Sequence, residues 1–171
     1  VRVIELTRKM IEIPSVESYT LEDHPEIIYI SLSMFNEHTA EELGKLLAQK
    51  DGKGIVLDLR NNPGGSLPAA VEVADYFVPQ GPIVYVVSRY GTEPYLADNQ
   101  KIGLPLVVLV NKGSASASEI VAGAIKDTFT GTLIGETTFG KGLVQTVFPL
   151  RGGAALKLTT AKYLTPLKHD I

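Results

Sequence analysis

The stretch GIVLDLR at residues 54–60 runs directly into NNPGG at residues 61–65. A short, mostly apolar run of this kind predicts a buried strand, and clustered Asn, Pro and Gly residues predict a turn. Apolar residues at helical spacing follow over residues 67–78. The same strand–turn–helix order repeats over residues 104–126. Two such units predict an α/β domain with a mostly parallel sheet and flanking helices.

Weaker patterns fill in the rest of the domain. A helix is expected from Thr39, where Thr39 and Glu42 have capping-box spacing and Gly52 follows the end. Residues 89–103 are polar and predict a surface loop. Further strands are expected at residues 1–13, 26–33, 83–87, 131–135, 143–148 and 155–163.

The amino-acid composition excludes several classes of function. The chain has 171 residues, a net charge of −3 and no cysteine, so one soluble domain is expected. No basic field favours nucleic acid, and the absence of cysteine excludes thiol catalysis and Cys-ligated zinc. The three histidines, His24, His38 and His169, lack the spacing of a metal site.

Two loops draw attention because each leaves a strand and enters a helix. They are residues 61–65 and 111–115. The carboxyl ends of parallel strands gather at one edge of a sheet and form ligand sites there. We therefore expect these loops to lie together and to carry the function.

Ser116 lies where the second loop becomes a helix, in the sequence GSASASE at residues 113–119. Its spacing from Glu119 fits a helix cap, which alone explains a serine there. A hydroxyl at a helix N-terminus is also suited to nucleophilic catalysis, because unpaired N–H groups surround it. Ser114 or Ser118 could supply the cap instead, so both interpretations stay open.

Lys141 is the best candidate for the base that a serine nucleophile needs. No histidine lies in a glycine-rich loop, and a neutral lysine is the alternative base. Lys141 lies between Gly140 and Gly142. A strand period of two places Gln145 on the same face, where its amide could orient the lysine. The competing interpretation is a solvated turn lysine.

Residues 135–141 also match the first seven positions of a phosphate-binding P-loop. The eighth position must be Ser or Thr, and here it is Gly142. A β-branched run follows instead of a helix, so a nucleotide site is disfavoured. The N–H groups of Gly64 or Gly65, together with that of Ala117, are candidate donors to an oxyanion.

Taken together, these motifs resemble the C-terminal processing peptidases, also called tail-specific proteases. The matching pieces are LDLRNNPGG (57–65), SASASEI (114–120) and GE…FGKG…Q (135–145). The resemblance implies a crotonase/ClpP-like α/β core that spans residues 1–171. It also implies a Ser–Lys dyad of Ser116 and Lys141.

The resemblance assigns further roles within that core. Gln145 would position the lysine, Asp127 would be an accessory acid, and the oxyanion donors would be Ala117 and one glycine of the Gly64–Gly65 turn. Asp127 also reads as a solvated residue at a helix end. No metal or organic cofactor is implied.

The expected function is that of a serine endopeptidase core that cleaves proteins near their C-termini. Expected partners are peptides with free C-termini and a PDZ domain in the longer parent. Residues 1–13 would be the end of that domain or the strand that follows it. The oligomeric state is left open, and the implied location is extracytoplasmic. We expect these 171 residues alone to fold with weak or no activity, because Gly140 and Gly142 give Lys141 little rigidity. The alternative is a non-catalytic peptide-binding module with the same fold.

Overall fold

The computed structural model describes residues 14–49, 51–98 and 102–171, together with Ile4 and Thr7. The strand expected over residues 1–13, and with it the proposed end of a PDZ domain, therefore lies outside the described residues. Among the described residues, no helix is long and apolar enough to cross a membrane.

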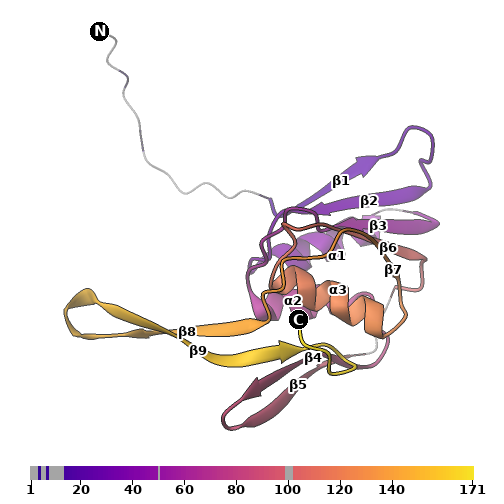
Figure 1. Ribbon diagram of the computed structural model, residues 1–171. Helices are drawn as coiled ribbons and strands as arrows, with labels where there is room; N and C mark the ends of the chain where they lie inside the picture. The colour runs from indigo at the N-terminus through magenta and orange to yellow at the C-terminus, as the bar shows by residue number, and fades with distance from the viewer. Residues whose placement is uncertain (1–3, 5–6, 8–13, 50, 99–101) are drawn as a thin grey trace.

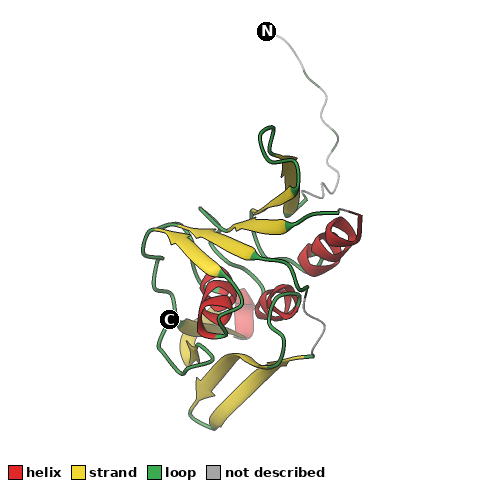
Figure 2. Ribbon diagram, turned by 90° about the vertical axis from the view of Figure 1, so that its right-hand side faces the viewer, coloured by secondary structure: helices red, strands yellow, loops and turns green. Residues whose placement is uncertain are grey.

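Two sheets enclose a layer of helices (Figures 1 and 2). The first sheet has the order β1-β2-β3-β6-β7 and the second the order β5-β4-β9-β8. The strands of the first sheet are β1 (Val16–Thr20), β2 (Ile27–Leu32), β3 (Gly54–Asp58), β6 (Leu106–Val110) and β7 (Thr132–Gly135). Those of the second are β4 (Gly81–Ser88), β5 (Gly91–Ala97), β8 (Leu143–Pro149) and β9 (Ala155–Leu164).

The first sheet confirms the expected parallel core. Strands β2, β3, β6 and β7 pair in parallel, and only β1 runs antiparallel. Alternate residues of these strands, such as Ile30, Leu57 and Val108, are fully buried against the helices. Strand β6 is apolar throughout and β3 is apolar up to its last residue, Asp58, as is typical of a parallel sheet. Their carboxyl ends therefore share one edge, where the two predicted loops begin.

Three helices form the middle layer: α1 (Thr39–Gln49), α2 (Leu67–Asp75) and α3 (Ala117–Asp127). Helix α2 ends earlier than the apolar pattern predicted. The capping box expected at Thr39 and Glu42 is wrong. Thr39 accepts from the N–H of Asn36, while the Glu42 carboxylate accepts from the N–H and hydroxyl of Ser15. Glu42 thus fixes the entry to β1 rather than the start of its own helix.

Two strands were missed by the sequence patterns. Residues 89–103 were expected to be a loop, but β5 forms a hairpin with β4 that turns at Gly91, whose φ is +139°. β1 is short and polar. Both lie at the edges of their sheets, where exposure removes the apolar alternation that marks a strand.

Candidate active site

The loops at residues 61–65 and 111–115 meet as expected, and a buried polar network joins them. The carbonyl oxygen of Asn62 accepts from the N–H of Ala115 at 3.0 Å and from the hydroxyl of Ser118 at 2.9 Å. The hydroxyl of Ser114 donates to the carbonyl of Leu59 at 2.7 Å. Because Asn62, Ser114 and Ser118 are fully buried, breaking these bonds would leave polar groups without water.

Asparagine side chains complete the network. Asn62 donates through its side-chain amide to the carbonyl of Leu32 and accepts from the N–H of Gly64, both at 2.9 Å. Asn111 accepts from the N–H of Asn61 at 2.9 Å and donates to its side chain at 3.0 Å. The NNPGG sequence is therefore a rigid frame and not only a turn.

Ser116 occupies a strained position at the N-terminus of α3. Its φ and ψ are 54° and −111°, a combination that costs a non-glycine residue about 1–3 kcal/mol and is concentrated at functional sites. Ser114 and Ser118 are buried and committed to the network described above. Ser116 forms the expected capping box with Glu119 at the start of α3, and of the three serines it is the one whose hydroxyl lies outside that buried network.

The glycine turn lies directly against Ser116. A Cβ atom built on Gly64 would stand 2.8 Å from the nitrogen of Ala117 and 2.9 Å from Cβ of Ser116. The N–H of Gly64 is occupied by Asn62, whereas that of Gly65 has no partner among the described residues. Ala117 is the first residue of α3, so its N–H has no acceptor within the helix.

Glu119 links the serine loop to the lysine loop. Its carboxylate is 5% exposed. One oxygen, Oε2, accepts from the N–H of Ser116 and from that of Lys141, each at 2.8 Å. The other, Oε1, accepts from the N–H of Gly140 at 2.6 Å. The sequence suggested only the local contact with Ser116, because the other two partners lie more than twenty residues away.

Lys141 therefore has its backbone held beside Ser116, but its side chain is exposed. Gln145 is also exposed, four residues along in β8 and on the same face as Leu143. Among the described residues, neither side chain forms a hydrogen bond with the Ser116 hydroxyl. The structure brings the backbones of the proposed dyad together and leaves the two side chains unjoined.

Asp127 lies at the far end of α3 from Ser116. The length of this helix separates the two by about 15 Å. Its buried carboxylate accepts from the N–H of Leu167 at 2.9 Å and lies 3.7 Å from Nδ1 of His169. The segment that Asp127 holds ends at Ile171, against which Gly142 packs. The contacts that the Asp127 carboxylate makes in the described part of the chain thus reach the lysine loop through residues 165–171.

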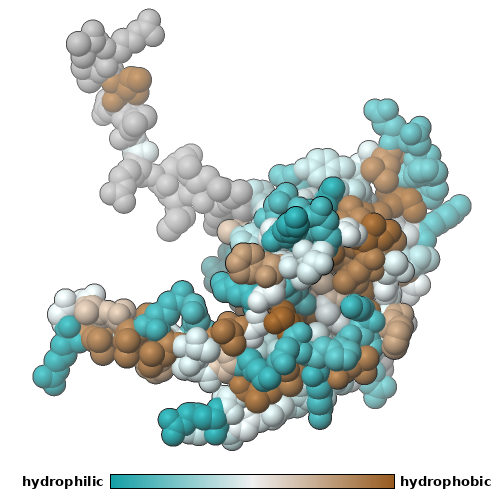
Figure 3. Space-filling view, viewed as in Figure 1, coloured by the Kyte–Doolittle hydropathy of each residue, from teal (hydrophilic) through white to brown (hydrophobic). Residues whose placement is uncertain are grey.

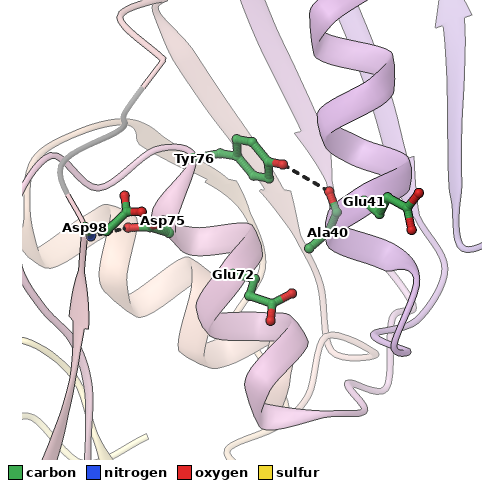
Figure 4. A pocket seen from close by; sticks show the side chains of 6 residues that line it. All are labelled: Ala40, Glu41, Glu72, Asp75, Tyr76 and Asp98. Atoms are coloured by element: carbon green, nitrogen blue, oxygen red, sulfur yellow. Dashed lines mark hydrogen bonds between the residues drawn. The ribbon is translucent and has the colours of Figure 1, made fainter.

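One cavity lies beside the proposed site and another lies away from it. One of about 340 Å³ lies behind the lysine loop, between α3 and residues 165–171. The other, of about 300 Å³, lies away from Ser116 and is lined by acidic side chains of α1, α2 and the end of β5 (Figure 4). There, burial raises the pKa of Asp75, whose carboxylate accepts from the N–H of Asp98. This second cavity has no contact with the proposed dyad.

A family model described as peptidase family S41 matches residues 26–171. The chain belongs to this family. It is 45% identical to a carboxyl-terminal-processing protease of Synechocystis, over 97% of this chain and 40% of that protein. It is 39% identical to carboxyl-terminal-processing peptidase 2, chloroplastic, of Arabidopsis thaliana, over 99% of this chain and 36% of that protein.

Solved structures agree with this assignment. The photosystem II D1 C-terminal processing protease superposes with a TM-score of 0.84 at 39% identity, covering 96% of this chain and 47% of that one. The resemblance drawn from the three motifs is confirmed, as is the α/β core. The chain spans less than half the length of these relatives.

Proposed function

We propose that this chain is the catalytic core of a serine endopeptidase that cleaves protein substrates near their C-termini. The observation that carries the proposal is the Glu119 carboxylate, which holds the backbones of Ser116 and Lys141 on one oxygen. A serine strained at a helix N-terminus, beside a glycine turn in which the N–H of Gly65 has no partner among the described residues, is suited to acyl transfer. A non-catalytic peptide-binding module would have no use for that combination.

In the proposed reaction, Oγ of Ser116 attacks the carbonyl carbon of the scissile peptide bond while its proton passes to the neutral amine of Lys141. Lys141 then gives this proton to the leaving nitrogen, and the acylated serine remains. Water completes the cycle by hydrolysing the ester. Gln145 would orient the lysine side chain once a bound peptide encloses it, because its amide can hydrogen-bond to the Lys141 amine.

The oxyanion formed in the attack needs two N–H donors. We assign them to Gly65 and Ala117, since the N–H of Gly64 is already bound to Asn62. Gly64 contributes by its lack of a side chain, because a Cβ there would collide with the Ala117 nitrogen. Asp127 would act on Lys141 indirectly, by holding residues 165–171.

The wider setting follows from the relatives and is part of the proposal. Three of them are named as chloroplastic, which is consistent with an extracytoplasmic location such as an organelle lumen or a periplasm. Substrates would be proteins with free C-termini. A PDZ domain elsewhere in the longer protein would select them by strand addition.

Proteolysis of an unstructured protein by the full-length protein tests this function. Product masses should show cuts near the C-terminus. Both Ser116→Ala and Lys141→Arg should lower the rate at least about 1,000-fold, while circular dichroism shows an unchanged fold. Tight binding of the substrate with no turnover by the unaltered protein would instead favour the peptide-binding module.

A further inference from the structure

Strand β8 has one open edge. It is the last strand of the second sheet in the described part of the chain, where it pairs only with β9. The N–H of Tyr163 donates to the carbonyl of Gly142, and the N–H of Leu150 donates to that of Ala154. Residues of an antiparallel strand turn their backbone groups alternately to its two edges. Even-numbered residues from Gly142 to Leu150 therefore face β9, and odd-numbered residues face the open edge.

The alternation continues through the irregularity in this hairpin. Val144 pairs with Ala161 and Gln145 with Thr159, so the extra residue belongs to β9 and not to β8. Leu143, Gln145 and Val147 consequently present their N–H and C=O groups to the open edge. Pro149 is the next member of the series and lacks an N–H, as is typical of an outward-facing position in an edge strand.

This open edge begins at the proposed active site. Lys141 precedes Leu143 in the outward-facing series, and its N–H donates to the same oxygen of Glu119 that accepts from the N–H of Ser116. The two nitrogens are therefore no farther apart than twice 2.8 Å. From there β8 runs outward as one strand of a projecting arm (Figure 1).

The arm also presents apolar surface. Leu143 and Val147, which share a face of β8, are 54% and 57% exposed. Figure 3 shows hydrophobic side chains along the projecting hairpin. An open strand edge with exposed apolar side chains pairs readily with another extended chain.

We infer that the edge of β8 from Leu143 to Val147 is a strand-addition site for the extended substrate segment that lies across Ser116. The inference rests on the proposed function and adds to it the mode of substrate binding. Pairing would be between backbone groups, so it tolerates different substrate sequences. From Lys141 to Val147 the edge spans about 20 Å, or about six residues of an extended peptide.

An N-methyl scan of the substrate tests this pairing without altering the protein. A fluorescent peptide of about twelve residues, centred on a mapped cleavage site, is methylated at one backbone nitrogen at a time. Binding to the Ser116→Ala variant is measured by fluorescence anisotropy. On one side of the cleavage site, every second methylation should weaken binding at least about 10-fold, and the intervening ones about 2-fold or less. Equal sensitivity at consecutive positions, or none, would overturn the inference.

A matched pair of variants tests the protein side. Leu143→Pro removes an outward-facing N–H, while Leu143→Ala removes the same side chain and keeps that N–H. The ratio of kcat/KM for the long peptide to that for a small activated ester should be about 10-fold lower in Leu143→Pro than in Leu143→Ala. Equal ratios would overturn strand addition. If the unaltered protein hydrolyses neither substrate, the proposed function fails. The N-methyl scan is then run with an extended peptide that the Ser116→Ala variant binds, and the same alternation would support the edge as a strand-addition site. Absence of the alternation, or of any peptide binding, would overturn the inference.

Discussion

The backbone N–H groups of Ser116 and Lys141 donate to the same carboxylate oxygen, Oε2 of Glu119. Ser116 begins α3 and Lys141 precedes β8, so this oxygen joins the helical layer to the second sheet. The glycines beside Lys141 leave its backbone free to move, and the buried carboxylate offsets that freedom. Glu119 is accordingly the residue on which the spacing of the proposed dyad depends.

Glu119→Gln should lower kcat about 10- to 100-fold, because the neutral amide presents one oxygen and an NH₂ group to three N–H donors. The free energy of unfolding should fall by about 1–3 kcal/mol. Steady-state kinetics and chemical denaturation measure the two effects. Glu93→Gln, on the exposed strand β5, is the control for removing a charge. An unchanged kcat in Glu119→Gln would show that the shared oxygen does not position the dyad.

Gly64→Ala should disable the site by crowding it. The new Cβ would lie 2.8 Å from the Ala117 nitrogen, at a φ of +98°. Displacing that donor should lower kcat about 100-fold. Gly81→Ala is the matched control, since Gly81 has a φ of +93° and nothing within 4 Å of a built Cβ. Gly81→Ala should lower the free energy of unfolding by about 1–2 kcal/mol, because alanine is strained at a positive φ, and it should leave kcat unchanged. Equal activities of the two variants would contradict the crowding argument.

Asp127 should act through the segment that it holds. Asp127→Asn keeps an oxygen that accepts from the N–H of Leu167, so it should retain most of the activity. Asp127→Ala leaves that N–H unpaired and should lower kcat about 10-fold or more, with a loss of about 1–3 kcal/mol in stability. Parallel kinetic and thermal measurements compare the two. If Asp127→Asn lowers kcat as much as Asp127→Ala does, then activity depends on the charge of Asp127 and not on its hydrogen bond to Leu167.

Asp58 gives the fold a predictable pH dependence. Burial alone would raise the pKa of this carboxyl, but hydrogen bonds from the Arg60 guanidinium and the Tyr29 hydroxyl outweigh it and hold the pKa below its ordinary value. A lowered folded-state pKa stabilises the protein above the unfolded value of about 4, and the stability is lost as the pH falls through the folded value. Asp58→Asn should therefore flatten the dependence of the unfolding free energy on pH below about pH 4. An unchanged acid slope in denaturant titrations would contradict this.

The sequence predicted the parts of the fold that bury apolar residues in a regular pattern. GIVLDLR and LVVLV became adjacent parallel strands, and the loops after them met. β1 and β5 were missed because edge strands are exposed and carry Glu, Ser and Pro instead of alternating apolar residues. The second sheet pairs two hairpins that lie far apart in the sequence. The spacing of apolar residues within a short stretch does not predict such long-range pairing.

The candidate site likewise has features that the sequence predicted and features that it did not. The proximity of Ser116 to the glycine turn could be predicted, since the two loops follow neighbouring parallel strands. The second role of Glu119 could not, because its spacing from Ser116 already fits a local cap. Likewise, only the folded chain shows that Gly64 gives its N–H to Asn62, which makes Gly65 the proposed donor.

The proposed function depends on Ser116 being a nucleophile that Lys141 and the N-terminus of α3 activate. Intact-mass and peptide-mapping mass spectrometry, after treatment of the full-length protein with a fluorophosphonate, tests it most directly. We expect a single adduct on Ser116, no adduct in Ser116→Ala, and labelling at least about 100-fold slower in Lys141→Ala. An adduct on Ser114 or Ser118, or equal labelling of the Ser116→Ala variant, would contradict it.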